Sequence, residues 1–201
     1  MSKAQSKNPP GAVSPKGKMM ILVGPSAVGK STFLAQAVKD FPELVDTITC
    51  TTRPMRPGEK EGNPYYFLSR QEFEEKVAQG YFVEFAEVHG NLYGTPRNQI
   101  EDNLAQGKTV IMDVDVQGAR TFKRKYPQSL TIFIHPPSFE VLRERLLKRD
   151  GTGAKDIELR LKNAQEELAT AQEFDRQLVN GDFAESYAVF KKIIEEVLGN
   201  R

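Results

Sequence analysis

The stretch that decides the fold is MMILVGPSAVGKSTF, residues 19–33. The apolar run at 19–24 predicts a short buried strand of the kind found in the middle of a parallel sheet. Residues 24–31 fit the pattern G-x-x-x-x-G-K-[ST] at every position, and 30–40 are expected to form a helix that ends before Pro42. A glycine-rich segment between a buried strand and a helix is typical of a phosphate-binding loop.

Each residue type in this loop has a chemical role in holding phosphate. Glycines let the backbone approach the phosphate oxygens, and successive N–H groups point inward at the start of the helix. Lys30 supplies a positive charge for the β- and γ-phosphates, and Ser31 supplies a hydroxyl ligand for Mg²⁺. The motif predicts a nucleoside triphosphate site but does not distinguish a kinase from a GTPase or a motor. The predicted nucleotide-binding residues are Gly24, Pro25, Ser26, Ala27, Val28, Gly29, Lys30, Ser31 and Thr32.

Further strands and helices extend this unit along the chain. Apolar segments at 108–115 and 129–137 predict two more buried strands, and helical segments alternate with them. The expected fold class is therefore α/β, a P-loop three-layer α/β/α arrangement with a central parallel sheet. Residues 49–95 break the alternation and predict an inserted, mainly β lobe. The strongly charged segment 138–173 predicts a helical flap.

The composition excludes several classes of protein. The net charge is +1, so no overall field favours nucleic acid, and no apolar run approaches the roughly 20 residues that span a bilayer. Cys50 is the only cysteine, which excludes an internal disulfide and suits a reducing compartment, so a cytoplasmic protein is expected. Residues 1–17 are polar and are expected to be a disordered tail before one domain at 18–201.

The inserted lobe carries a pattern that suits a phosphate monoester. Arg53 and Arg56 lie three residues apart on a loop stiffened by prolines, so their guanidinium groups are partly pre-positioned. Glu59 is placed to orient them, and Tyr65 and Tyr93 are placed to donate phenol hydrogen bonds. The alternative interpretation is a solvated basic loop.

Four polar residues on predicted strands or at their ends suit recognition of a guanine and a metal. The Glu84 carboxylate can accept hydrogen bonds from guanine N1–H and N2–H₂, and the Thr95 hydroxyl can reach O6 or N7. Asp113 and Asp115 end a parallel strand, at the ligand-binding edge of an α/β sheet. Asp113 is expected to bind Mg²⁺ with Ser31, directly or through water, and Asp115 to reach the acceptor. The alternatives are a surface strand residue for Glu84 and a helix cap for Asp115.

Five segments together resemble the guanylate kinase family: VGPSAVGKST, TTRPMRPGEKEGNPYYF, VEFAEVHGNLYGT, IMDVDVQGA and RLKNAQEEL. They stand in the family's order and cover most of 19–198. The resemblance implies the reaction ATP + GMP ⇌ ADP + GDP, with Mg²⁺ as cofactor, ATP as co-substrate and dGMP as a further acceptor. It also implies three parts: a core (18–48, 96–137 and 174–201), a GMP-binding lobe (49–95) and a lid (138–173).

The resemblance assigns roles to individual residues as well. Arg145, Arg149 and Arg160 of the lid would close over the triphosphate and, with Lys30 and Arg53, would be catalytic. Asn180 would meet the adenine. The residues expected to surround GMP are Thr49, Arg53, Arg56, Glu59, Tyr65, Glu84, Tyr93, Thr95 and Asp115.

Two positions depart from the family's pattern, and two other functions remain open. Leu147 stands where the lid often has a further arginine, and Gly181 separates Asn180 from Asp182. The first alternative is a phosphotransferase acting on a phosphorylated sugar, and the second is a non-catalytic protein-binding module of guanylate kinase type. No nucleic acid or membrane partner is expected, and the protein is expected to be a monomer or a small homo-oligomer.

Overall fold

The computed structural model describes residues 17–88, 90–150 and 154–199, and within these residues the chain forms two five-stranded sheets. The central sheet has the strand order β10-β9-β1-β8-β2, and every neighbouring pair is parallel. The predicted parallel sheet is thus confirmed, with the strand before the glycine-rich loop at its centre. Its strands are β1 (Lys18–Val23), β2 (Leu44–Asp46), β8 (Thr109–Asp113), β9 (Leu130–His135) and β10 (Arg176–Val179).

Helices cover both faces of this sheet. They are α1 (Lys30–Asp40), α3 (Arg97–Ala105), α4 (Val116–Lys125) and α7 (Phe183–Leu198). Successive residues of a strand point to opposite faces, so Leu22 packs with α1 and α7, whereas Ile21 packs with α3 and α4. The three-layer α/β/α fold expected from the sequence is confirmed.

The second sheet is built from the chain between β2 and α3, with the strand order β4-β5-β3-β7-β6. Its elements are β3 (Cys50–Thr51), β4 (Lys60–Glu61), β5 (Pro64–Phe67), α2 (Arg70–Ala78), β6 (Phe82–Val88) and β7 (Asn91–Pro96). Ser69 begins α2 with a capping box that it shares with Glu72. A small hydrophobic core of its own, which contains Cys50, Phe73 and Phe82, holds α2 against the strands.

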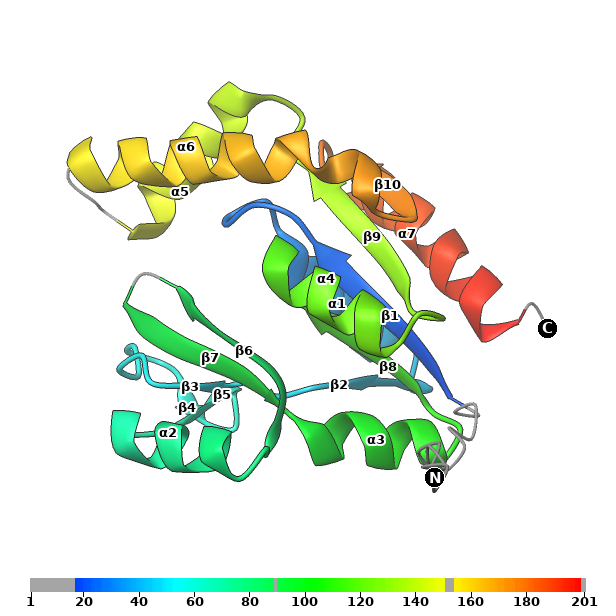
Figure 1. Ribbon diagram of the computed structural model, residues 1–201. Helices are drawn as coiled ribbons and strands as arrows, with labels where there is room; N and C mark the ends of the chain where they lie inside the picture. Colours follow the sequence, from blue (N-terminus) through cyan, green and yellow to red (C-terminus); the bar gives the residue numbers. More distant parts are fainter. Residues whose placement is uncertain (1–16, 89, 151–153, 200–201) are drawn as a thin grey trace, which may run out of the picture.

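Two long helices follow β9, namely α5 (Phe139–Asp150) and α6 (Ala154–Ala169), and the short 3₁₀ helix η1 (Ala171–Glu173) comes after them. Leu142 and Leu146 of α5 and Ala164 of α6 are buried in the hydrophobic core on the α1 side of the central sheet. Figure 1 shows this helix pair and the second sheet on either side of the loop that follows β1. The loop therefore faces a space between two projecting parts.

Three short strands were not predicted. β2 was not assigned as a strand, and β3 and β4 lie in the segment 47–64, which was interpreted as loop. Each has only two or three residues, which is too short for alternation to appear in the sequence. The predicted tail, apart from Gly17, lies outside the described residues. Of the helices that the described residues form, none is long and apolar enough to cross a membrane.

Candidate active site

The loop after β1 has the backbone conformation that its glycines predict. Gly24 and Gly29 have φ angles of 139° and 103°, in a region that favours glycine. A Cβ atom at Gly24 would lie 2.5 Å from the carbonyl oxygen of Ile134, so the loop packs directly on β9. Ala27 has a φ of 63°, which is uncommon for a residue with a side chain. The loop is thus wound tightly at the end of the central strand.

The lysine and the serine of this loop are tied to the strand ends around them. Lys30 Nζ donates to the carbonyl oxygens of Gly24 and Pro25, at 2.5 and 3.1 Å. Ser31 Oγ donates to Asp113 Oδ2 at 2.9 Å, which joins the start of α1 to the end of β8. The hydroxyl and the carboxylate that the sequence assigned to one metal are therefore adjacent.

A cleft of about 1050 Å³ extends from this loop to the second sheet and to α6. It brings together sixteen of the residues that the sequence singled out, from all three parts of the chain. They are Gly24, Ser26, Ala27, Gly29, Lys30, Ser31, Thr32, Thr49, Arg56, Tyr65, Glu84, Tyr93, Asp113, Asp115, Arg145 and Arg160.

The cleft lining does not include six other predicted residues. Pro25 and Val28 belong to the loop itself, and Thr95 lies behind Glu84, with its hydroxyl donating to Glu84 Oε1 at 2.8 Å. Arg149 belongs to α5, but its side chain is outside the described part of the chain. The residues that do not line the cleft are Pro25, Val28, Arg53, Glu59, Thr95 and Asn180.

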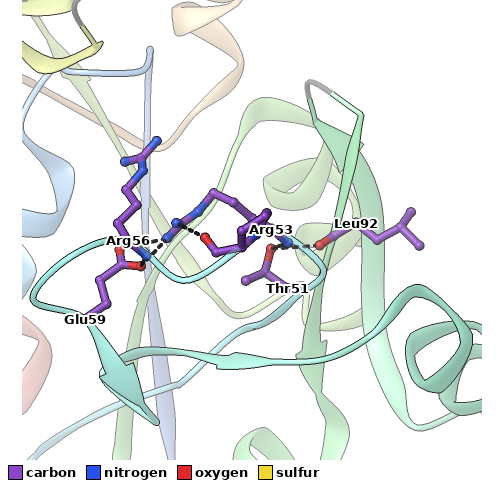
Figure 2. Close-up of polar contacts among 6 residues, drawn as sticks. Thr51, Arg53, Arg56, Glu59 and Leu92 are labelled. Atoms are coloured by element: carbon purple, nitrogen blue, oxygen red, sulfur yellow. Dashed lines mark hydrogen bonds and ion pairs between the residues drawn. The ribbon is translucent and has the colours of Figure 1, made fainter.

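The loop that carries Arg53 and Arg56, here called the arginine loop, holds one guanidinium group in place and leaves the other facing the cleft (Figure 2). Arg53 donates to both carboxylate oxygens of Glu59, at 2.8 and 3.0 Å, and to the carbonyl oxygen of Pro54 at 2.7 Å. The Arg53 backbone N–H donates to the buried Thr51 hydroxyl, and Glu59 also accepts from the Arg56 N–H at 2.8 Å. These hydrogen bonds fix the loop, while the Arg56 side chain extends away from Glu59 and lines the cleft.

Aromatic side chains support the same loop from the sheet. The Arg53 guanidinium carbon lies 5.4 Å from the centre of the Tyr65 ring and 5.7 Å from that of Phe67. Tyr65 and Tyr93 are edge-on to each other, with ring centres 5.8 Å apart, and both line the cleft. The hydrogen bonds from Arg53 hold the pKa of Glu59 below its ordinary value, so Glu59 is ionised and the pair stays intact at neutral pH.

Glu84 lies opposite Thr95 in the β6–β7 pair, next to an irregularity in the strand register. Burial raises the pKa of the Glu84 carboxyl to about 7; the Thr95 hydrogen bond opposes this shift and the charge of Asp115 adds to it. A carboxylate that has lost water in this way gains more from a ligand that donates to it. Glu84 thus has the position and the environment of a binding group.

Replacement of Glu84 by glutamine should stabilise the protein above neutral pH. The folded state holds the Glu84 proton up to about pH 7, whereas the unfolded state releases it near its ordinary pKa of about 4.3. Wild-type stability therefore falls as the pH rises between these values, and E84Q avoids that loss. We expect the difference in melting temperature, E84Q minus wild type, to grow from near zero at about pH 4.5 to a plateau above about pH 7.5.

Glu43→Gln, at an exposed position, controls for the removal of a surface charge. A melting-temperature difference for E84Q that does not vary with pH would contradict the raised pKa.

Several cleft residues were not predicted from the sequence. Asn163, Glu166, Glu167 and Thr170 line the cleft from α6 and its end, and Gln117 and Arg120 line it from α4. Burial raises the pKa of the Glu167 carboxyl to about 7; the charge of Lys30 opposes this shift and that of Asp115 adds to it. Asn163, Glu166 and Glu167 of α6 and Thr170 just after it recur at the spacing of one helical face, and this spacing was visible in the sequence.

The strand ends and the lid supply the remaining predicted residues. Asp115 caps α4 by accepting from the Gly118 N–H at 2.7 Å, which confirms the helix-cap interpretation. It also lines the cleft, and its contact with the acceptor stays a prediction. Arg145 and Arg160 line the cleft from α5 and α6. The Asn180 side chain is buried and donates to the carbonyl oxygen of Val28 at 2.7 Å, beneath the loop.

A glycine-rich phosphate loop on the central strand of a parallel sheet, facing a lobe with a cleft arginine, defines the class of P-loop phosphotransferases. The family model described as guanylate kinase matches residues 16–197. The chain belongs to the guanylate kinase family.

Named relatives agree with this membership. The chain is 48% identical over 183 residues to a guanylate kinase of Bdellovibrio bacteriovorus, which covers 91% of this chain and 99% of that one. It is 47% identical over 167 residues to a guanylate kinase of Nostoc sp., covering 83% and 84%. The crystal structure of guanylate kinase from Anaplasma phagocytophilum superposes with a TM-score of 0.74 at 34% identity, and covers 92% of this chain and 88% of that chain.

Proposed function

We propose that this chain transfers the γ-phosphoryl group of ATP to GMP across the described cleft, with the loop at 24–31 holding ATP and the second sheet holding GMP. As a guanylate kinase it is an ATP:GMP phosphotransferase, and ATP is its co-substrate. The observation that carries the assignment of sites is that Lys30 and Arg56 line the same cleft from different parts of the chain. The family comparisons favour neither the sugar-phosphate enzyme nor the protein-binding module.

The residues of the cleft are suited to bring two anions together. Phosphoryl transfer to a phosphate oxygen needs no covalent intermediate and no strong base, so positioning and charge stabilisation supply the catalysis. In our proposal Lys30 transfers its hydrogen bonds from the carbonyls of Gly24 and Pro25 to the ATP phosphates. Arg56 binds the GMP phosphate with Tyr65 and Tyr93, and Arg53 with Glu59 holds the loop that presents Arg56.

Guanine recognition is assigned to Glu84, Thr95 and Asp115. Glu84, ionised on binding, accepts from guanine N1–H and N2–H₂, and the Thr95 hydroxyl orients the Glu84 carboxylate. Asp115, which lines the same cleft, is assigned to the guanine as well. Thr49 lines the same region. Adenine lacks the donor pair that Glu84 requires, so AMP should be a poor acceptor.

Mg²⁺ fits the residues at the end of β8. Ser31 Oγ and Asp113 Oδ2 lie 2.9 Å apart and are hard oxygen donors, the kind that Mg²⁺ takes singly or in pairs with substrate phosphates and water. We propose that Ser31 and Asp113 hold it, directly or through water. When bound, Mg²⁺ would neutralise charge on the β- and γ-phosphates.

The boundaries of the moving parts belong to the same proposal. We assign the core to 18–48, 96–137 and 174–201, the GMP-binding lobe to 49–95 and the lid to 138–173, which agrees with the separate core of the second sheet. Arg145, Arg149 and Arg160 would close with the lid and exclude water from the reacting phosphates. We further propose dGMP as an acceptor, a monomer or small homo-oligomer, no nucleic acid or membrane partner, and a cytoplasmic location, which the single cysteine supports.

The test is a panel of acceptors assayed for ADP production from ATP, with and without Mg²⁺. GMP and dGMP should turn over, AMP and ribose 1,5-bisphosphate should not, and omission of Mg²⁺ should abolish the reaction. IMP lacks the 2-amino donor and should lose about tenfold or more in kcat/KM relative to GMP. ADP production without an acceptor would indicate a hydrolase, and equal use of AMP and GMP would contradict the role of Glu84.

A further inference from the structure

The side-chain amide of Asn180 is hydrogen-bonded to the phosphate-binding loop. Asn180 directly follows β10, and the residue is only 6% exposed. Its Nδ2 donates to the carbonyl oxygen of Val28 at 2.7 Å, and its backbone N–H donates to the carbonyl oxygen of His135 at 2.8 Å. The first contact joins residues that are 152 positions apart, so the end of an edge strand holds the loop after the central strand.

The loop is shaped to receive this amide. Gly29 has a φ of 103°, and a Cβ atom there would lie 2.4 Å from Asn180 Nδ2. A side chain at Gly29 would therefore displace either the amide or the loop. Gly29 therefore allows the close contact with Asn180, as well as the approach of the backbone to a bound phosphate.

The hydrogen bond fixes the orientation of one peptide group. In a planar trans peptide the C=O and the next N–H point in opposite directions. Because the Val28 carbonyl points at Asn180, the Gly29 N–H points away from Asn180. Gly29 lines the cleft at the start of α1, where N–H groups bind anions.

The lid meets the core at the same carbonyl group. Arg145 of α5 donates to the Val28 carbonyl oxygen at 3.4 Å and to the Asn180 carbonyl oxygen at 3.2 Å. In the proposed function Arg145 binds phosphate, and a move from these carbonyls would leave Asn180 as the member of this pair that still holds the Val28 carbonyl. The amide would then support the loop while the lid acts on the substrate.

We propose that Asn180 is a positioning residue for the phosphates of the donor: it holds the Val28–Gly29 peptide so that the Gly29 N–H faces the triphosphate. The proposal rests on the assignment of this loop to ATP under the proposed function. It differs from the expectation that Asn180 recognises adenine, because the loop contact acts on phosphate whichever base is attached.

A probe without a base separates the two roles. Binding of Mg²⁺-loaded inorganic tripolyphosphate and of Mg·ATP is measured by calorimetry for wild type, Asn180→Asp and Asn180→Ala. Aspartate keeps the shape but turns an acceptor toward the Val28 carbonyl, and alanine removes the donor. We expect both variants to weaken tripolyphosphate and ATP by the same factor, about tenfold to a hundredfold, and to leave the KM for GMP unchanged.

Two further measurements exclude a general loss of structure. Arg176→Ala, an exposed position on the same strand, is the matched control and should bind both ligands as wild type does. Hydrogen exchange of the Val28 amide, which donates to the Pro25 carbonyl oxygen at 3.3 Å within the loop, should accelerate in the Asn180 variants, well below their melting temperatures, while amides of β8 stay protected. A variant that loses ATP but keeps tripolyphosphate binding would overturn the proposal in favour of adenine recognition, and so would unchanged binding of both. Wild-type transfer from ATP to GMP is measured separately, so failure of the proposed function would be seen independently.

Discussion

Lys30→Ala should reduce kcat by about 10²–10³-fold or more while the melting temperature stays close to that of wild type. Lys30 is the loop's only side-chain ammonium, and it lies in the cleft at the start of α1. Its hydrogen-bond partners without substrate include two carbonyl groups of the loop, which we expect a bound phosphate to replace as acceptors. In the variant, the charge that develops in the transition state loses the one positive partner that the loop itself supplies.

The measurement is steady-state kcat and KM for ATP at saturating GMP, with thermal unfolding of the same samples. Lys39→Ala is the matched control, because Lys39 lies on the same helix at an exposed position away from the cleft. Turnover of the Lys30 variant within about threefold of wild type would remove Lys30 from the catalytic machinery and would require another cation at the β- and γ-phosphates.

Features that are continuous in the sequence could be predicted, and those that depend on distant contacts could not. The strand, loop and helix at 19–40 are one uninterrupted pattern, and the structure has them within a residue or two. β2 pairs with β8 over only three residues, so its existence depends on the sheet and not on its own pattern. The contact of Asn180 with Val28 likewise depends on how β10 pairs with β9.

The charged helices show why composition was a poor guide to the lid. Of the many charged residues in the segment 138–173, only three arginines were singled out from the sequence. In the structure one face of α6 brings Asn163, Glu166 and Glu167 into the cleft. The apolar residues Ile157, Leu161 and Ala164 of α6 pack in the core on the α1 side, so they mark the inward face of this helix. They do not show which polar residues beside that face reach the cleft, because that depends on where the loop and the end of β8 lie.

The arginine loop separates two residues that the sequence could not rank. Spacing made Arg53 and Arg56 equivalent, and both were expected to bind the GMP phosphate. In the structure the Arg53 side chain is only 11% exposed and is held by Glu59, whereas Arg56 lines the cleft. A buried ion pair is costly to break because the remaining partner is left without compensation. The Arg53 side chain is thus held by the loop in this state, and we therefore assign the first contact with the GMP phosphate to Arg56.

Arg56→Ala should raise the KM for GMP by about tenfold to a hundredfold with a smaller change in kcat. The reason is that a guanidinium hydrogen bond to phosphate is made both in the bound substrate and in the transition state, so its loss is mainly a loss of binding. Arg53→Ala should also raise this KM, but with a lower melting temperature, because Glu59 loses its partner and the loop loses its support. The measurements are KM for GMP at saturating ATP and thermal unfolding of both variants.

Lys60→Ala is the control for the loss of a positive charge near the lobe, since Lys60 is exposed on β4 and does not line the cleft. It should leave the KM for GMP within about twofold of wild type. If Arg56→Ala behaved like Lys60→Ala while Arg53→Ala lost GMP binding at an unchanged melting temperature, the roles of the two arginines would be reversed. Arg53 would then have to leave Glu59 when GMP binds, and the ion pair would belong only to the state without substrate.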